Sequence, residues 1–248
     1  MSLAQGRGRI KMSCFPCLQT CSSLAHVLMN MTRTRAVLFD MDGLLFDTEA
    51  TLKRIWQQEA ARLGFDLHDE LYAELVGVPN VVCEEKLVQW FRDFPMQDFR
   101  RNWRLVREEE RRLTPIPPKA GARELLAWLH DQGVPMALAT SSTREAVERN
   151  REAWPELFPF AVIMTVEEVE RPKPDPDIYL KTCARLGVAA RDCVIFEDSN
   201  PGMRAGIASG ARAIMIPDLA RPEPWVRAGA AGLYESLAQA LASRADWF

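Results

Sequence analysis

The strongest constraint on the fold is a repeating pattern in the second half of the chain, where short apolar runs alternate with amphipathic stretches. The runs are VPMALAT (134–140), FAVIMT (160–165), CVIFED (193–198) and RAIMIPD (212–218). Such runs, bounded by Gly, Pro or acids, are typical of strands buried on both faces of a parallel sheet. The stretches between them have the spacing of helices, at 120–133, 142–154, 176–187 and 200–210. This alternation predicts a doubly wound, Rossmann-like α/β fold with right-handed crossovers.

Residues 48–114 interrupt this alternation. In four successive segments, apolar residues recur there at intervals of three to four among charged residues, without a strand-like run. One apolar run, AVLF (36–39), precedes them, and a Pro-rich linker, TPIPPKAG (114–121), follows them. We therefore expect residues 34–47 and 115–248 to form the α/β core, with an inserted α-helical cap domain at 48–114.

Composition excludes several classes of protein. The 31 basic residues do not outnumber the 34 acidic ones, which argues against a nucleic-acid partner. No stretch of eighteen uninterrupted apolar residues is present, so no membrane span is predicted. Six cysteines in 248 residues are too few for a disulfide scaffold. A cytoplasmic protein in a reducing compartment is expected, and the sequence does not indicate its oligomeric state.

The first 33 residues form a leader of different character, with no acidic residue before Asp40. Arg-containing, acid-poor starts are typical of organellar transit peptides. A disordered leader, or translation from a start upstream of the true one at Met29 or Met31, also explains the composition and is favoured over a transit peptide. The spacing of Cys14, Cys17 and Cys21 hints at zinc, with His26 as the candidate for a fourth ligand.

Polar side chains follow the predicted strands at their carboxyl ends, where α/β sheets bind ligands. They are Asp40 and Asp42 with Gly43, then Thr140, Ser141 and Ser142, and then Glu197 and Asp198, while Lys173 lies in the loop RPKPDPD (171–177). Carboxylates gathered at one edge repel one another unless a cation lies among them, and oxygen ligands suit Mg²⁺. A lysine and hydroxyl groups could hold phosphate oxygens. The set predicts phosphoryl transfer.

Four segments carry a family resemblance: FDMDG (39–43), LATSS (138–142), PKPDPD (172–177) and FEDSNPG (196–202). In this order they resemble the four motifs of the haloacid dehalogenase-like hydrolases, in the helical-cap subfamily related to β-phosphoglucomutase and small-molecule phosphatases. The resemblance covers residues 35–240. It implies an Mg²⁺-dependent phosphatase of small phosphate monoesters, such as a sugar or polyol phosphate, acting through an aspartyl-phosphate.

The resemblance also implies a role for each matching residue. Asp40 corresponds to the nucleophile and Asp42 to the general acid and base. Thr140, the backbone N–H of Ser141 and the Lys173 ammonium correspond to the phosphate-binding groups. The implied metal ligands are Asp40, the backbone carbonyl of Asp42, Glu197 and Asp198. For Ser142, a phosphate contact and a helix N-cap are both open.

Other functions fit the sequence less well than the phosphatase. β-Phosphoglucomutases bind the sugar and its second phosphate through a cap histidine and a cap arginine, where this chain has Leu52 and Asn80. Hydrolysis is therefore favoured, with a β-phosphoglucomutase-like mutase as the alternative. A non-enzymatic scaffold is disfavoured because every chemical residue is present. Asp42 argues against dehalogenases and phosphonate hydrolases, which lack that second acid.

Overall fold

The computed structural model describes residues 34–76 and 80–248, without the side chains of Asn80, Val81, Arg111 and Arg112. The predictions made for the leader, including the transit peptide and the zinc ligands Cys14, Cys17, Cys21 and His26, lie outside the described residues. The comparison made for the Asn80 side chain lies outside them too.

In the described part of the chain, six parallel strands form one sheet in the order β3-β2-β1-β4-β5-β6. Their bounds are β1 Ala36–Phe39, β2 Met136–Ala139, β3 Val162–Met164, β4 Cys193–Glu197, β5 Arg212–Met215 and β6 Gly232–Leu233. The central strand β1 pairs with both β2 and β4, so that Phe39 aligns with Leu138 on one side and Phe196 on the other. The strand order confirms the predicted doubly wound α/β class.

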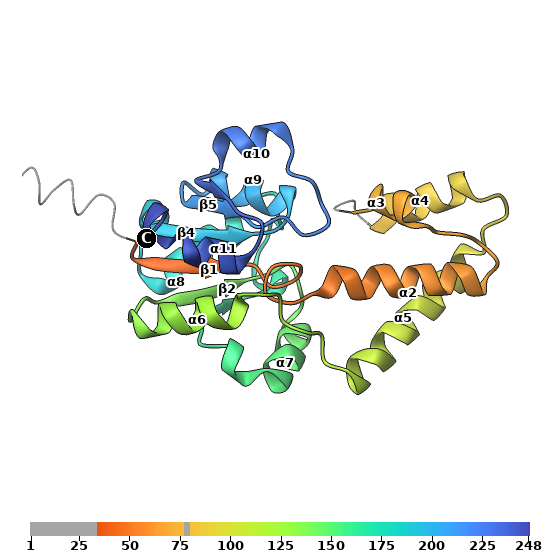
Figure 1. The fold of residues 1–248 in the computed structure, drawn as a ribbon, viewed down its shortest axis with the longest axis horizontal. Coiled ribbons are helices and arrows are strands. Elements are labelled where there is room, and N and C mark those ends of the chain that lie inside the picture. The colour runs from red at the N-terminus through yellow and green to blue at the C-terminus, as the bar shows by residue number, and fades with distance from the viewer. Residues whose placement is uncertain (1–33, 77–79) are drawn as a thin grey trace, which may run out of the picture. The chain divides into compact units, whose positions relative to one another are not determined.

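Alternate residues of the strands pack into different apolar layers, which explains why the runs are apolar without interruption. Val37 and Phe39 belong to a cluster with helices α6 (Ala122–Asp131), α7 (Arg144–Ala153) and α11 (Leu237–Ala242). Ala36 and Leu38 belong to a second cluster with α8 (Asp177–Leu186) and α9 (Asn200–Ala208). Helices therefore cover both faces of the sheet (Figure 1).

Between β1 and α6 the chain forms four helices and, among its described residues, no strand. They are α2 Thr48–Arg62, α3 Asp69–Ala73, α4 Asn80–Trp90 and α5 Met96–Leu113. Their apolar residues form a cluster of their own, in which the Trp56 ring lies edge-on to Tyr72 and Phe99. This segment runs from orange to yellow-green in Figure 1. The four helices lie where the sequence predicts them.

Three elements near the C-terminus were not predicted: the short strand β6 and the helices α10 (Pro224–Gly229) and α11. Each spans six residues or fewer, so a periodic pattern has too few repeats to stand out. The Trp247 ring that follows α11 is 2% exposed and lies edge-on to Phe196 of β4.

Among the helices of the described residues, none is both long enough and apolar enough to cross a membrane.

Candidate active site

Asp40 is the first residue after β1 and lies at the carboxyl edge of the sheet. Its backbone N–H donates to the Phe196 carbonyl oxygen of β4 at 3.1 Å, and the residue is 6% exposed. Burial, together with Glu197 and Asp42, raises the pKa of Asp40 to about 7, although Lys173 opposes the shift. A further positive charge beside this carboxylate would favour its ionised form.

Lys173 lies beside Asp40, as the sequence predicts. The side chain is 6% exposed, and Nζ donates to Asp40 Oδ1 at 2.5 Å and to Glu197 Oε1 at 2.6 Å. The Ala139 carbonyl oxygen, 3.1 Å away, accepts a third hydrogen bond. Burial favours the neutral amine, but the two carboxylates outweigh it and raise the pKa of Lys173 well above its ordinary value. The ammonium is thus charged and aligned toward Asp40.

Both carboxylate oxygens of Glu197 accept hydrogen bonds from the protein, unlike those of a carboxylate that is free to bind a metal ion. The residue is fully buried, and Oε1 accepts hydrogen bonds from Lys173 and from the Tyr179 hydroxyl at 2.7 Å. Oε2 accepts from the backbone N–H of Asp198 at 3.1 Å and from Ser199, both N–H and Oγ, at 3.2 and 3.0 Å. A Cβ on Gly202 would lie within 1.9 Å of this carboxylate, so only glycine fits there. With both oxygens engaged by protein donors, Glu197 anchors Lys173.

Asp198 has the environment expected of a cation ligand. The residue is 8% exposed, and no described residue donates a hydrogen bond to its carboxylate. Burial raises its pKa well above the ordinary value, with Glu197 and Asp40 adding to the shift. Among the described residues, no group of three or more His, Cys, Asp or Glu side chains is arranged to hold a metal ion. Asp40, Asp198 and the Asp42 carbonyl nevertheless fit Mg²⁺, which commonly takes one or two carboxylates plus phosphate and water.

The loop after β2 carries the predicted phosphate-binding groups. Thr140 is 1% exposed, and its Oγ1 accepts a hydrogen bond from the Ser142 N–H at 3.0 Å, which leaves the hydroxyl proton able to donate elsewhere. The backbone N–H of Ser141 donates to no described residue. Both donors line the same cavity as Asp40 and Lys173. The loop therefore presents two donors where phosphate oxygens could lie.

Ser142 does not cap the following helix, which corrects one of its two predicted roles. Thr143 is the N-cap of α7, and its Oγ1 accepts from the Ala146 N–H at 3.3 Å. Ser142 Oγ instead donates to Asp42 Oδ2 at 2.5 Å. Adjacent hydroxyl residues are both plausible caps in a sequence, and only the backbone geometry distinguishes them. Ser142 thus orients the predicted acid and base.

A cavity of about 420 Å³ opens above these groups. Of the predicted residues, Asp40, Asp42, Thr140, Ser141, Lys173 and Asp198 line it. The helical segment adds Thr48, Glu49 and Leu52 from α2 and Arg107 from α5, of which only Leu52 was considered from the sequence. Glu49 could have been identified from the sequence, because it lies where the chain passes from the first motif into the helical segment, directly after Asp47 and Thr48. Arg107 lies among several arginines of α5, and nothing in the sequence distinguishes it from the others.

Three of these side chains from the helical segment are polar and only partly satisfied. Thr48 Oγ1 is buried without a hydrogen-bond partner among the described residues. Arg107 forms no ion pair with them, and burial lowers its pKa while Asp42 and Glu49 oppose the shift. Burial also raises the pKa of Glu49, helped by Asp218 and Asp42. These groups could contact whatever is attached to a bound phosphate.

Comparison with known proteins agrees with the geometry. The family model for haloacid dehalogenase-like hydrolases matches residues 37–216. A phosphorylated carbohydrates phosphatase of Thermotoga maritima is 33% identical over 204 residues, covering 80% of this chain and 93% of that protein. Hexitol phosphatase A of Escherichia coli is 31% identical, with 74% of this chain and 83% of that protein covered.

A solved structure extends this agreement to three dimensions. A haloacid dehalogenase family hydrolase of Deinococcus radiodurans, crystallised with phosphate and sodium, superposes with a TM-score of 0.71. It is 28% identical, and the match covers 87% of this chain and 98% of that one. Sequence match, fold and assembled motifs agree, and the chain belongs to the haloacid dehalogenase-like hydrolases.

Proposed function

We propose that this protein is a Mg²⁺-dependent phosphatase that hydrolyses small phosphate monoesters, sugar or polyol phosphates, through an aspartyl-phosphate on Asp40. The observation that carries the proposal is the buried contact between Lys173 Nζ and Asp40 Oδ1, 2.5 Å long, on the wall of a cavity that Thr140 and Asp198 also line. A carboxylate held beside a fixed positive charge, with hydroxyl and amide donors nearby, can attack a phosphate that those donors bind.

In the first step, an Asp40 carboxylate oxygen attacks phosphorus and the bond from phosphorus to the leaving oxygen breaks. Asp42 gives its proton to that oxygen, so the leaving group departs as an alcohol. In the second step, Asp42 removes a proton from water, the water oxygen attacks phosphorus, and the bond to Asp40 breaks. Inorganic phosphate is released and both carboxyl groups return to their starting states.

The other residues bind and orient the phosphate. Lys173 and the donors of Thr140 and Ser141 would neutralise and hold the non-bridging oxygens of the phosphoryl group, which form and break no bonds to phosphorus in either step. Asp40, Asp198 and the Asp42 carbonyl would hold Mg²⁺, which when bound neutralises negative charge on the phosphate. Glu197 keeps Lys173 in place through their contact of 2.6 Å.

We propose that the helical segment acts as the cap domain. Its residues in the cavity favour a substrate whose leaving group carries several hydroxyl groups. Glu49 and Arg107 bring opposite charges to the cavity, and the Thr48 hydroxyl lacks a partner there. Such a wall offers hydrogen-bond donors and acceptors to the hydroxyl groups of a sugar or polyol. Two similar proteins are named for phosphorylated carbohydrates and hexitols. Leu52, at the position of the mutase histidine, also lines the cavity and favours hydrolysis.

The experiment that tests the function is a panel of phosphate esters assayed for inorganic phosphate with Mg²⁺ and with EDTA. We expect sugar or polyol phosphates to be hydrolysed only with Mg²⁺, and the D40N variant to lose activity by at least about 10³-fold because an amide cannot act as the nucleophile. An active D40N variant would contradict the mechanism. Incubation with a hexose 1-phosphate and a trace of hexose bisphosphate distinguishes the phosphatase from the mutase. Inorganic phosphate is the product of a phosphatase, whereas formation of the hexose 6-phosphate would identify a mutase.

A further inference from the structure

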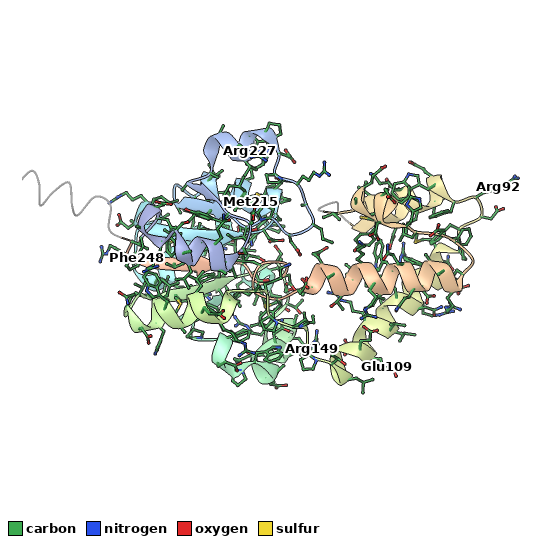
Figure 2. All side chains as sticks on the ribbon, viewed as in Figure 1. Arg92, Glu109, Arg149, Met215, Arg227 and Phe248 are labelled. Atoms are coloured by element: carbon green, nitrogen blue, oxygen red, sulfur yellow. The ribbon has the colours of Figure 1, made fainter. Side chains whose placement is uncertain are left out.

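Asp218 is an acidic residue at the catalytic edge of the sheet that the proposed mechanism does not use. It follows β5, whose last residue Met215 is labelled in Figure 2. Met215 aligns with Glu197 of β4, and the Ile216 N–H donates to the Glu197 carbonyl oxygen at 2.7 Å. The parallel pairing therefore carries Asp218 to the same edge as Asp198. The side chain of Asp218 is 7% exposed.

The two carboxylate oxygens of Asp218 differ in their surroundings. Oδ1 accepts a hydrogen bond from Lys119 Nζ at 2.6 Å. Oδ2 is buried and has no hydrogen-bond partner among the described residues. Leaving such an oxygen without a donor is costly, because its hydration is lost and nothing replaces it. A hydrogen-bond donor that is not part of the polypeptide, such as a bound water molecule, would satisfy Oδ2.

Gly43 shows where Oδ2 lies. A Cβ at Gly43 would be 2.3 Å from Asp198 Oδ2 and 3.3 Å from Asp218 Oδ2, so both oxygens lie against the same stretch of backbone. Two carboxylates facing one small space repel unless positive charge or hydrogen-bond donors lie between them. Asp198 is the residue proposed above as a Mg²⁺ ligand.

The contact with Lys119 does not by itself explain this arrangement. Lys119 Nζ also lies 3.4 Å from Asp47 Oδ1, so it links both acids, and this accounts for the position of Oδ1. Lys119 donates no hydrogen bond to Oδ2. Among the described residues, no three Asp, Glu, His or Cys side chains are placed so that they could hold a metal ion together. Direct binding of the cation by Asp218 is therefore not indicated.

We propose that Asp218 is an outer-shell positioning residue of the divalent-cation site, whose Oδ2 accepts a hydrogen bond from a water molecule bound to the cation. The inference rests on the proposed function, since it assumes that Asp40 and Asp198 hold Mg²⁺. Metal-bound water is a strong donor, and outer-shell carboxylates commonly orient such ligands. Lys119 accounts for Oδ1 only, and Oδ2 lies near Asp198 because both oxygens pack against Gly43.

The test is isothermal titration of the metal-free full chain with MgCl₂, repeated for the D218N, D47N and K119M variants. Loss of an outer-shell partner typically weakens metal binding by about 10- to 100-fold, and we expect this for D218N. D47N is the matched control, because it removes the other acid bonded to Lys119 and should keep the wild-type Mg²⁺ affinity. K119M removes a positive charge near the site, so its Mg²⁺ affinity should be unchanged or tighter.

Two outcomes would overturn the inference. Wild-type Mg²⁺ affinity in D218N would show that Oδ2 does not support the cation. Equal weakening in D218N and K119M would show that only the link between Asp218 and Lys119 matters. If D218N does not fold, the D218S variant, which also removes the negative charge, is titrated in its place, and wild-type Mg²⁺ affinity in D218S would overturn the inference in the same way. Weaker Mg²⁺ binding in D47N would also contradict it. Failure of the proposed function itself is distinguishable, since the wild-type chain would then neither bind Mg²⁺ nor release phosphate.

Discussion

At the scale of the residue, the site depends on how two buried charges are satisfied. Lys173 and Glu197 have side chains that are 6% and 0% exposed, and each would be costly to bury alone. Glu197 accepts hydrogen bonds at both oxygens, and Lys173 donates to three acceptors. The pair therefore provides a fixed positive charge for Asp40. Asp198 receives no such hydrogen bonds from the described residues, which is why we propose it as a cation ligand.

The Ser142 hydroxyl gives a prediction at this scale. The S142A variant should lose about tenfold in kcat/KM with little change in stability, because one hydrogen bond to the Asp42 carboxylate contributes about 1.5 kcal/mol. Steady-state assays on the best ester of the panel measure this loss.

The neighbouring T143A variant is the matched control. It removes the N-cap hydroxyl of α7 and should lower the free energy of unfolding by about 1 kcal/mol while leaving kcat/KM unchanged. The assignment of the two hydroxyls is wrong if T143A impairs catalysis and S142A does not.

At the scale of the element, the strands were predictable because buried parallel strands must be apolar along their whole length. The chemistry at their carboxyl ends followed from the same pattern. Asp218 ends the run RAIMIPD and could have been assigned to the site by the argument that identified Asp198. Its significance lies in the unpaired Oδ2, and hydrogen bonding of a single atom is not encoded in a local pattern.

Other features of the site required the tertiary structure. The burial of Glu197 among Lys173, Tyr179 and Ser199 depends on how α8 and α9 approach β4. Arg107 belongs to α5, which carries many basic residues, and its place in the cavity depends on the register of that helix against α2. An amphipathic pattern identifies a helix but does not indicate which of its polar residues faces a ligand.

A prediction at the scale of the element concerns Glu168, which links the segment after β3 to α7 and α8. Partial burial opposes its ionisation, but Arg185, the Thr165 N–H and Arg144 outweigh it and lower the pKa of Glu168 to about 2 from its ordinary 4.5. Because the folded-state pKa is depressed, the stabilisation is complete above about pH 4.5 and is lost as the pH falls toward 2.

The E168Q variant should therefore be less stable than wild type by about 1–2 kcal/mol at pH 7, and the difference should shrink below pH 4.5. Urea unfolding at several pH values measures the difference. The E152Q variant, which removes an exposed charge from α7, is the control and should differ little from wild type at any pH. A constant deficit of E168Q across the pH range would show that the charge of Glu168 is not responsible.

At the scale of the whole molecule, the parallel sheet brings distant parts of the sequence to one edge. Lys173 and Asp40 are separated by 133 residues along the chain and are in hydrogen-bond contact. The helical segment between β1 and α6 contributes Thr48, Glu49, Leu52 and Arg107 to the lining of the same cavity. Under the proposed function, the sheet edge would carry out the chemistry on the phosphate and the helical segment would select the leaving group.

The most direct test of the central claim is to trap the covalent intermediate. The wild-type protein, mixed with Mg²⁺ and its best substrate and quenched in acid within milliseconds, would be digested and analysed by mass spectrometry. We expect a phosphoryl group on Asp40 that forms at a rate no slower than turnover and is absent from D40N. Steady release of inorganic phosphate without any phosphorylated Asp40 at any quench time, or the same modification at another residue, would contradict the proposed mechanism.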